Sequence, residues 1–150
     1  MATALREYLS ILVLHETELW NLVDRHLHAA EGTVTLGRLE ILRVIGTVDT
    51  CRIQDVADRI RITVGTASRL TDRLEADGLV ARSAHPTDRR SSQIELTDDG
   101  RRALDATEPA VERALAELLS EYDTHELAAV TASLRQAHAL LLNPNQNGAA

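Results

Sequence analysis

Apolar side chains recur at steps of three and four residues along most of this chain, which is the pattern of helices that bury one face. Leu5, Leu9 and Leu12 begin the first such stripe. Gly32 and Gly78 stand where helices are expected to end, because glycine commonly follows a last helical turn. Helices are expected over residues 5–28, from 35 or 37 to about 46, over 53–59 and over 64–77.

The pattern changes to a shorter period after the fourth helix. Residues 79–84 and 93–97 form two strand-like segments, and the polar stretch 85–92 joins them. This arrangement predicts a β-hairpin with a long charged tip.

The last third of the chain returns to helical spacing. One helix is expected to begin at Asp98 or Asp99, and a second covers about 124–142. Pro109 lies inside the first of them and is expected to kink or break it. Their apolar stripes favour coiled-coil-like packing against each other or against a second chain. The predicted fold class is therefore mainly α with a small β-hairpin.

Composition and charge narrow the candidate partners. The chain holds 23 Leu and 21 Ala but no Phe, so an aliphatic core is expected. Its 16 basic residues are all Arg and stand against 23 acidic ones, and the net charge of −7 argues at first against a nucleic-acid partner. Residues 59–90, however, hold 7 Arg and 4 acidic residues and are locally +3. Duplex DNA remains a candidate partner for that segment, whereas the scarcity of aromatic residues disfavours single strands.

A helix-turn-helix is predicted in this basic segment. Residues 53–59, the turn 60–62 and the helix 64–77 have the lengths of that motif, and Thr63 is placed to cap the second helix. Such a second helix enters the major groove with its N-terminal residues toward the base edges. The candidate DNA-binding residues of this segment are Thr63, Gly65, Thr66, Ser68, Arg69 and Arg73.

The tip of the hairpin offers a second candidate contact. Arg89 and Arg90 suit a minor groove, because narrow A·T stretches attract arginine. Asp88 beside them is interpreted as a carboxylate that orients an arginine through the fork geometry of that pair. Taken without its context, the same charged tip would be a solvated loop.

Three short motifs follow one another across the hairpin. Gly-Leu-Val stands at 78–80, Pro-Thr-Asp-Arg-Arg at 86–90 and Leu-Thr-Asp-Asp-Gly at 96–100. With these motifs, residues 70–104 resemble the winged helix-turn-helix core of the MarR (multiple antibiotic resistance regulator) family. The resemblance extends over 35–104 and is weaker, though consistent in order, at both ends of the chain.

The resemblance implies one MarR-type domain over residues 1–150. Residues 35–103 would form a winged helix-turn-helix lobe that binds double-stranded DNA, residues 1–32 and 104–143 dimerisation helices, and residues 144–150 a disordered tail. Proteins of this family are homodimers that bind near-palindromic operators. The expected function is therefore a cytoplasmic transcriptional regulator, namely a repressor that responds to a ligand.

Family positions also imply roles for individual residues. They place Thr66, Ser68, Arg69 and Arg73 at the DNA, with the wing arginines at the minor groove. Arg61 occupies a turn position where many members carry glycine. This departure leaves two alternatives open, a looser turn or an arginine that reaches a phosphate.

The resemblance further implies a small-molecule pocket between the dimerisation helices and the winged lobe. Trp20, Asp24, His28 and Arg38 are the candidate lining residues, for a small aromatic or acidic effector. The alternative for Trp20 is an ordinary core position, because tryptophan among helical apolar residues is more often plain core.

Other candidate chemistry is weaker. Cys51 is either a small residue in a loop or a redox sensor, and exposure with a lowered pKa would distinguish the two. His26 and His28 are two residues apart and point to nearly opposite faces of a helix, so no metal site is expected. No catalytic motif or cofactor loop is present in the sequence, which argues against an enzyme.

Two other functions compete with DNA-binding regulation. One is a winged-helix module that mediates protein contacts, and the other is a small-molecule-binding protein without DNA binding. The apolar run 9–14 is too short for a membrane span, so no membrane partner is expected.

Overall fold

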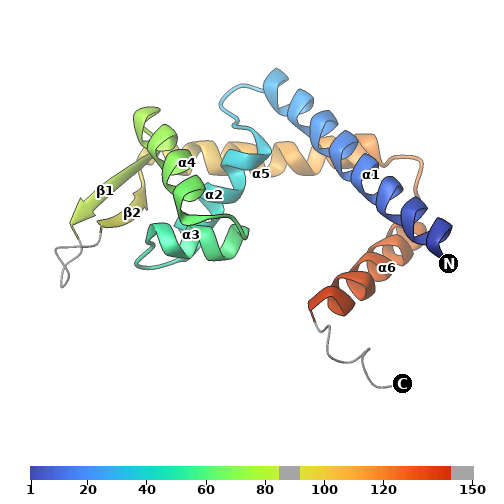
Figure 1. The fold of residues 1–150 in the computed structure, drawn as a ribbon. Coiled ribbons are helices and arrows are strands. Elements are labelled where there is room, and N and C mark those ends of the chain that lie inside the picture. The colour runs from blue at the N-terminus through green and yellow to red at the C-terminus, as the bar shows by residue number, and fades with distance from the viewer. Residues whose placement is uncertain (85–91, 143–150) are drawn as a thin grey trace. The chain divides into compact units, whose positions relative to one another are not determined.

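The computed structural model describes residues 1–84 and 92–142. The fold is mainly α with one antiparallel two-stranded hairpin, as predicted (Figure 1). The elements are α1 (Ala2–Ala29), α2 (Leu36–Thr47), α3 (Ile53–Ile60), α4 (Val64–Ala76), β1 (Val80–Ala84), β2 (Ser92–Leu96), α5 (Asp98–Leu118) and α6 (Thr124–Leu142). The chain divides after Leu115 into two compact units, each described here on its own. The single-domain boundaries expected from the sequence stay a prediction.

The core of the first unit is aliphatic and lies beneath the helix-turn-helix. Leu42 on α2, Val56 on α3, Leu74 on α4 and Ile94 on β2 are each at most 1% exposed. Burial of side chains of this size stabilises a fold by about 2 kcal/mol each. Because these four residues come from four elements, the same burial fixes the hairpin against the helices.

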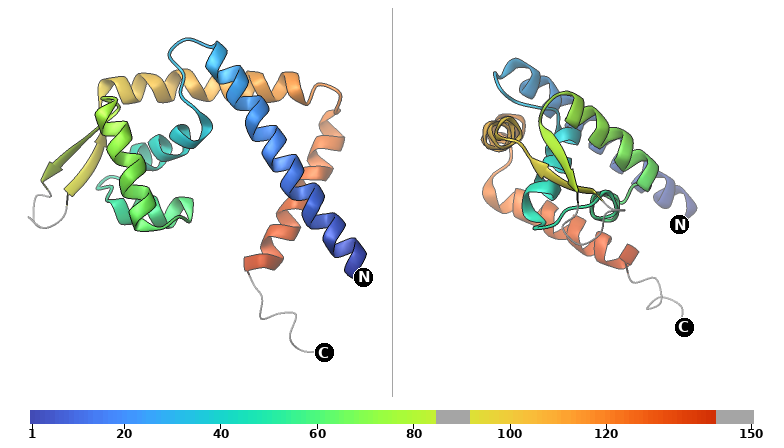
Figure 2. Two further views of the ribbon diagram at one scale, coloured as in Figure 1. Left: turned by 45° about the horizontal axis from the view of Figure 1, so that its top comes forward. Right: turned by 90° about the vertical axis from the view of Figure 1, so that its left-hand side faces the viewer.

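The hairpin lies beside α4 in the views of Figures 1 and 2. Its register pairs Val80 with Leu96 and Ala84 with Ser92. On β1, Arg82 bonds two carboxylates of α4, with Nη2 2.5 Å from Oδ1 of Asp72 and Nη1 3.4 Å from Oε2 of Glu75. One arginine therefore ties the hairpin to α4.

The turn between α3 and α4 is tight despite the arginine at its centre. Arg61 adopts the left-handed conformation, with φ 61° and ψ 44°, in which glycine is usual because it lacks a Cβ. The Ile62 amide donates to the carbonyl of Ala57 at 3.0 Å. The first alternative from the sequence, a looser turn, is thus wrong. The turn keeps its hydrogen bond, and Arg61 adopts a strained backbone conformation.

The end of α4 and the start of α5 are joined by one hydroxyl. Thr97 Oγ1 donates to the carbonyl of Gly78 at 2.7 Å and accepts from the amide of Gly100 at 3.0 Å. A Cβ on Gly100 would lie 1.9 Å from the carbonyl oxygen of Leu79. The helix begins at Asp98, one of the two starts predicted, but its capping oxygen comes from the preceding Thr97 rather than from an aspartate.

The expected break at Pro109 does not occur, because α5 continues through it to Leu118. Pro109 lies on the exposed face of the helix, as does Asp105 one turn before it. The Asp105 carbonyl, which loses its helical donor to the proline, can therefore be hydrated.

The second unit contains α6, which begins with a reciprocal cap. The Glu126 amide donates to Oδ1 of Asp123 at 2.8 Å, and the Asp123 amide donates to Oε2 of Glu126 at 2.9 Å. No residue of α6 is buried. Its apolar stripe is therefore solvated in the single chain. Among the helices of the described ranges, none has the length and hydropathy needed to cross a membrane.

Candidate nucleic-acid interface

The N-terminus of α4 is capped as predicted, and we call α4 the reading helix because it is the helix that the sequence predicts to enter the major groove. Thr63 Oγ1 accepts from the amide of Thr66 at 3.2 Å, and the two hydroxyl oxygens lie 2.9 Å apart. A capped helix N-terminus is well ordered and carries a partial positive charge that favours phosphate. The first turn of the reading helix is thus suited to an anionic partner.

The reading helix has one buried and one exposed face. Ala67, Thr71 and Leu74 are buried against the core. Gly65, Arg69 and Arg73 are spaced four residues apart and are all exposed, while Thr66 and Ser68 are half-buried beside them. The predicted contact residues of the helix therefore lie on or next to its outer face.

Gly65 has open space around it. A Cβ built at this position meets no atom within 4 Å, so packing within the chain does not require glycine there. Arg69 extends back along the helix, with Nη2 3.5 Å from Oγ1 of Thr66. The outer surface of the first turn is thus shallow at Gly65 and flanked by a guanidinium group.

Ion pairs between described residues involve the carboxylates of this region and leave most of its arginines unpaired. All three carboxylates in residues 59–84 meet an arginine, since Asp72 and Glu75 pair with Arg82 and Asp77 pairs with Arg38. Four exposed arginines of the same stretch make no ion pair within the described residues, namely Arg59, Arg61, Arg69 and Arg73. Each carboxylate of this stretch therefore meets a guanidinium group, whereas the charges left unpaired within the described structure are all positive and exposed. Arg59 was not singled out from the sequence, although its place in the last turn of α3 carries the same signal.

The predicted wing contacts Asp88, Arg89 and Arg90 lie outside the described residues. The strands that lead to them are anchored, because Ile94 and Leu96 are buried and Ile94 donates from its amide to the Cys51 carbonyl at 2.8 Å. The base of the hairpin is thus held firmly beside the reading helix.

The four candidate ligand residues are divided between separate places. His28 and Arg38 line one hollow of about 390 Å³, which we call the junction hollow, together with Leu27, Thr33, Val34 and Thr35. Trp20 lines another of about 230 Å³, with Glu16, Leu19, Val23, Leu36, Val111 and Leu115. Asp24 lines neither, because its Oδ1 accepts from the Leu36 amide at 2.7 Å and so caps α2.

The loop that forms the wall of the junction hollow is fixed by hydroxyl groups. Thr33 Oγ1 donates to the Leu27 carbonyl at 2.6 Å, and the Val34 amide donates to Oγ1 of the buried Thr107 at 3.0 Å. His28 Nδ1 lies 2.6 Å from the Asp24 carbonyl. The hollow is therefore a preformed feature with one guanidinium and one imidazole on its wall.

Cys51 is fully buried, and its burial raises the pKa of the thiol to about 11, with the nearby carboxylate of Asp55 adding to the rise. A redox-sensing thiol needs exposure and a lowered pKa. The structure therefore favours the interpretation of Cys51 as a small residue of the core.

Residues 34–92 match the model of the MarR family. Among curated proteins, the chain is 28% identical over 93 residues to the uncharacterised HTH-type transcriptional regulator YdgJ of Bacillus subtilis (strain 168). The matched region covers 62% of this chain and 57% of YdgJ. The chain is 30% identical over 108 residues to the HTH-type transcriptional repressor YetL of the same organism, covering 71% of this chain and 64% of that one. The chain spans about three fifths of the length of the curated relatives that it matches first.

Solved structures share the fold. A mutant MarR from E. coli complexed with operator DNA has a TM-score of 0.76 at 19% identity, over 85% of this chain and 91% of that one. A structure of Bordetella bronchiseptica BpsR, on the regulation of its DNA binding by 6-hydroxynicotinic acid, has a TM-score of 0.74 at 22% identity, over 88% of this chain and 98% of that one. At such identities the likeness shows a shared fold.

Proposed function

We propose that this chain, which belongs to the MarR family through its residues 34–92, is a transcription regulator that binds double-stranded DNA. The observation that carries the proposal is the group of exposed arginines around the reading helix that no described carboxylate neutralises. Guanidinium groups without a carboxylate partner are available to phosphates and base edges, and DNA releases counterions when it meets them. The relatives named as regulators and as a repressor support the same function.

The proposed contacts follow from the faces of the elements. The first turn of the reading helix enters the major groove, where the open space at Gly65 permits close approach of the backbone. Arg69 and Arg73 reach the bases and phosphates from the outer face of that helix. Arg61 contacts a phosphate, and the wing residues 88–90 complete the site at the minor groove.

The regulator is proposed to act as a homodimer on a near-palindromic operator. In the first unit, α1 carries apolar side chains that are 57–63% exposed at Leu5, Leu9 and Leu14. In the second, α6 exposes Leu134 and Leu141 by 45% and 73%. Apolar faces of this extent mark contact surfaces, and a second copy of the chain would cover them. Two reading helices about one DNA turn (~34 Å) apart would then meet successive major grooves.

An acidic effector is proposed for the junction hollow. Arg38 offers hydrogen-bond donors that suit a carboxylate, and Leu27 and Val34 offer an apolar wall. His28 lines the same hollow with its Nδ1 hydrogen already donated to the Asp24 carbonyl. The BpsR structure concerns 6-hydroxynicotinic acid, a small aromatic acid, which is the class of compound that such a wall fits. Repression relieved by this effector is the regulatory mode that we propose.

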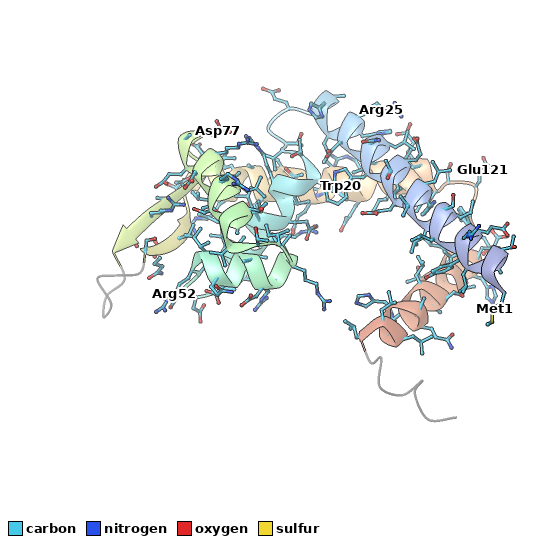
Figure 3. The ribbon with its side chains drawn as sticks, viewed as in Figure 1. Met1, Trp20, Arg25, Arg52, Asp77 and Glu121 are labelled. Carbon is cyan, nitrogen blue, oxygen red and sulfur yellow. The ribbon has the colours of Figure 1, made fainter. Side chains whose placement is uncertain are left out.

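Selection of bound fragments from duplex DNA, followed by fluorescence anisotropy with the chosen duplex, tests DNA binding. Arg69→Ala is expected to weaken duplex binding by about 1–3 kcal/mol and to relax its sequence specificity. Arg25→Ala is the matched control, because Arg25 is an exposed arginine on α1, away from the reading helix (Figure 3). Equal effects of the two variants, or no salt-dependent binding by the parent, would overturn the proposal in favour of a protein-interaction module or a ligand-binding protein.

A further inference from the structure

Arg38 lies on the walls of two neighbouring hollows. One is the junction hollow, and the other has a volume of about 370 Å³ and a charged wall. This second, charged hollow is lined by Gly32, Thr33, Val34, Arg38, Asp77, Leu79, Asp99, Arg102 and Ala103. Arg38 is therefore shared by the junction hollow and by a hollow whose wall carries two carboxylates, Asp77 and Asp99.

Within the charged hollow Arg38 is paired with Asp77, which directly follows the reading helix (Figure 3). The two residues are 39 positions apart in sequence, so the pair ties the start of α2 to the end of the reading helix. Arg102 lies in the same hollow but is paired with Asp99 one turn earlier on its own helix. Arg102 is thus engaged elsewhere, and within the described residues Asp77 is paired with Arg38.

Asp77 is an unfavourable residue at its position unless a cation is near. It is the C-terminal cap of the reading helix, and its amide donates to the Arg73 carbonyl at 3.0 Å. The carbonyl end of a helix carries a partial negative charge, which repels a carboxylate there. Arg38 compensates part of this repulsion, so an arginine on the wall of the junction hollow also stabilises the last turn of the reading helix.

We propose that Arg38 is a point of exchange, at which the carboxylate of a small acid in the junction hollow takes the guanidinium from Asp77 and thereby loosens the end of the reading helix. The inference rests on the proposed function and adds to it the residue through which an effector reaches the DNA-binding surface. Arg38 acts as a positioning residue for the reading helix. The exchange involves hydrogen bonds and charge only.

The strength of the existing pair permits such an exchange. The side chains of Arg38 and Asp77 are 39% and 47% exposed, so solvent screens their attraction and the pair is worth only a few-fold in an equilibrium. A ligand carboxylate that meets the guanidinium in the two-bond fork geometry gains more than it displaces. The ligand and Asp77 compete for the guanidinium group of Arg38, so the ion pair lowers the affinity for the ligand. Removal of the Asp77 charge must therefore raise that affinity by the same factor.

Benzoate and its uncharged analogue benzamide are probes that isolate the carboxylate. Binding to the full-length chain without DNA is followed by calorimetry and by the emission of Trp20, the single tryptophan, whose ring lies 3.9 Å from where a Cβ on Gly37 would stand, next to Arg38. Asp77→Asn is expected to tighten benzoate binding about two- to fivefold and to leave benzamide unchanged. Arg38→Gln is expected to weaken benzoate at least tenfold. Asp99→Asn, which removes a carboxylate of the same hollow, is the control and should leave benzoate binding unchanged.

Benzoate binding that is equal or weaker in Asp77→Asn, that is tightened as much by Asp99→Asn, or that is absent from both the parent and Asp77→Asn overturns the exchange. With DNA added, benzoate should weaken duplex binding by the parent more than by Asp77→Asn. If the parent does not bind duplex DNA at all, the proposed function fails, while the competition between benzoate and Asp77 is still decided by the measurements without DNA.

Discussion

Arg61 keeps a backbone conformation that costs a non-glycine residue about 1–2 kcal/mol. Strained residues of this kind persist where the surrounding fold holds them, and they gather at functional sites. Here the neighbouring Ile62 amide is bonded to Ala57 and the Arg61 side chain is exposed. The phosphate contact proposed for its guanidinium group would give a reason for an arginine at this strained position.

Arg61→Gly is expected to raise the free energy of unfolding by about 0.5–1 kcal/mol, because relief of the strain exceeds the extra entropy of glycine in the unfolded chain. The same variant should bind duplex DNA more weakly. Arg59→Gly, at a helical position two residues earlier, is the control and should destabilise the fold by about 1 kcal/mol. Thermal denaturation followed by circular dichroism decides, and a lower midpoint for Arg61→Gly would contradict the strain argument.

Cys51 makes the stability of the fold depend on alkaline pH. Burial holds the thiol neutral in the folded chain up to a pKa of about 11, whereas the unfolded thiol ionises near 9.0. As the pH rises from about 9 to 11 the unfolded state alone loses this proton, so the parent should lose about 2 kcal/mol relative to Cys51→Ala. Urea unfolding of both proteins across this range measures the difference. Parallel profiles would show that the thiol is not held neutral.

At the scale of elements, the joint between the reading helix and α5 depends on the closeness of two backbones. Thr97 bonds both Gly78 and Gly100, and Gly100 lies against the Leu79 carbonyl. The three- and four-residue spacing of apolar side chains predicted where the helices lie. The preference for threonine at the N-terminal cap of a helix predicted the role of Thr63. The joint was missed because its partners are separated by a hairpin, and no local pattern specifies which hydroxyl reaches across it.

Gly100→Ala is expected to cost about 3 kcal/mol or more, because its Cβ would lie 1.9 Å from a backbone oxygen that cannot move alone. Gly65→Ala is the matched helical control, where open space should let alanine stabilise the fold by up to about 1 kcal/mol. Chemical unfolding of both variants gives the comparison. A small effect of Gly100→Ala would mean that the two backbones can separate at little cost.

At the scale of the whole molecule, the net charge of −7 conceals an ordered distribution. The sequence predicts a basic middle segment, and pairing of Asp72, Glu75 and Asp77 leaves its outer arginines available. What could not be predicted are the long-range partners, above all Arg38 with Asp77, and the separation of Trp20 from His28 into different hollows. The ion pair and the separation of the two hollows depend on how the helices pack in three dimensions. The spacing of residues along the sequence does not specify that packing.

The Thr97 joint has a mechanical consequence. Because one hydroxyl bonds both the turn after the reading helix and the first turn of α5, we expect these two segments to move together. α5 has 21 residues and is about 30 Å long, so a rotation by about 5° about its first turn would move its last turn by about 3 Å. We therefore expect a small displacement of the last turn of α5 to change the angle at which the reading helix is presented.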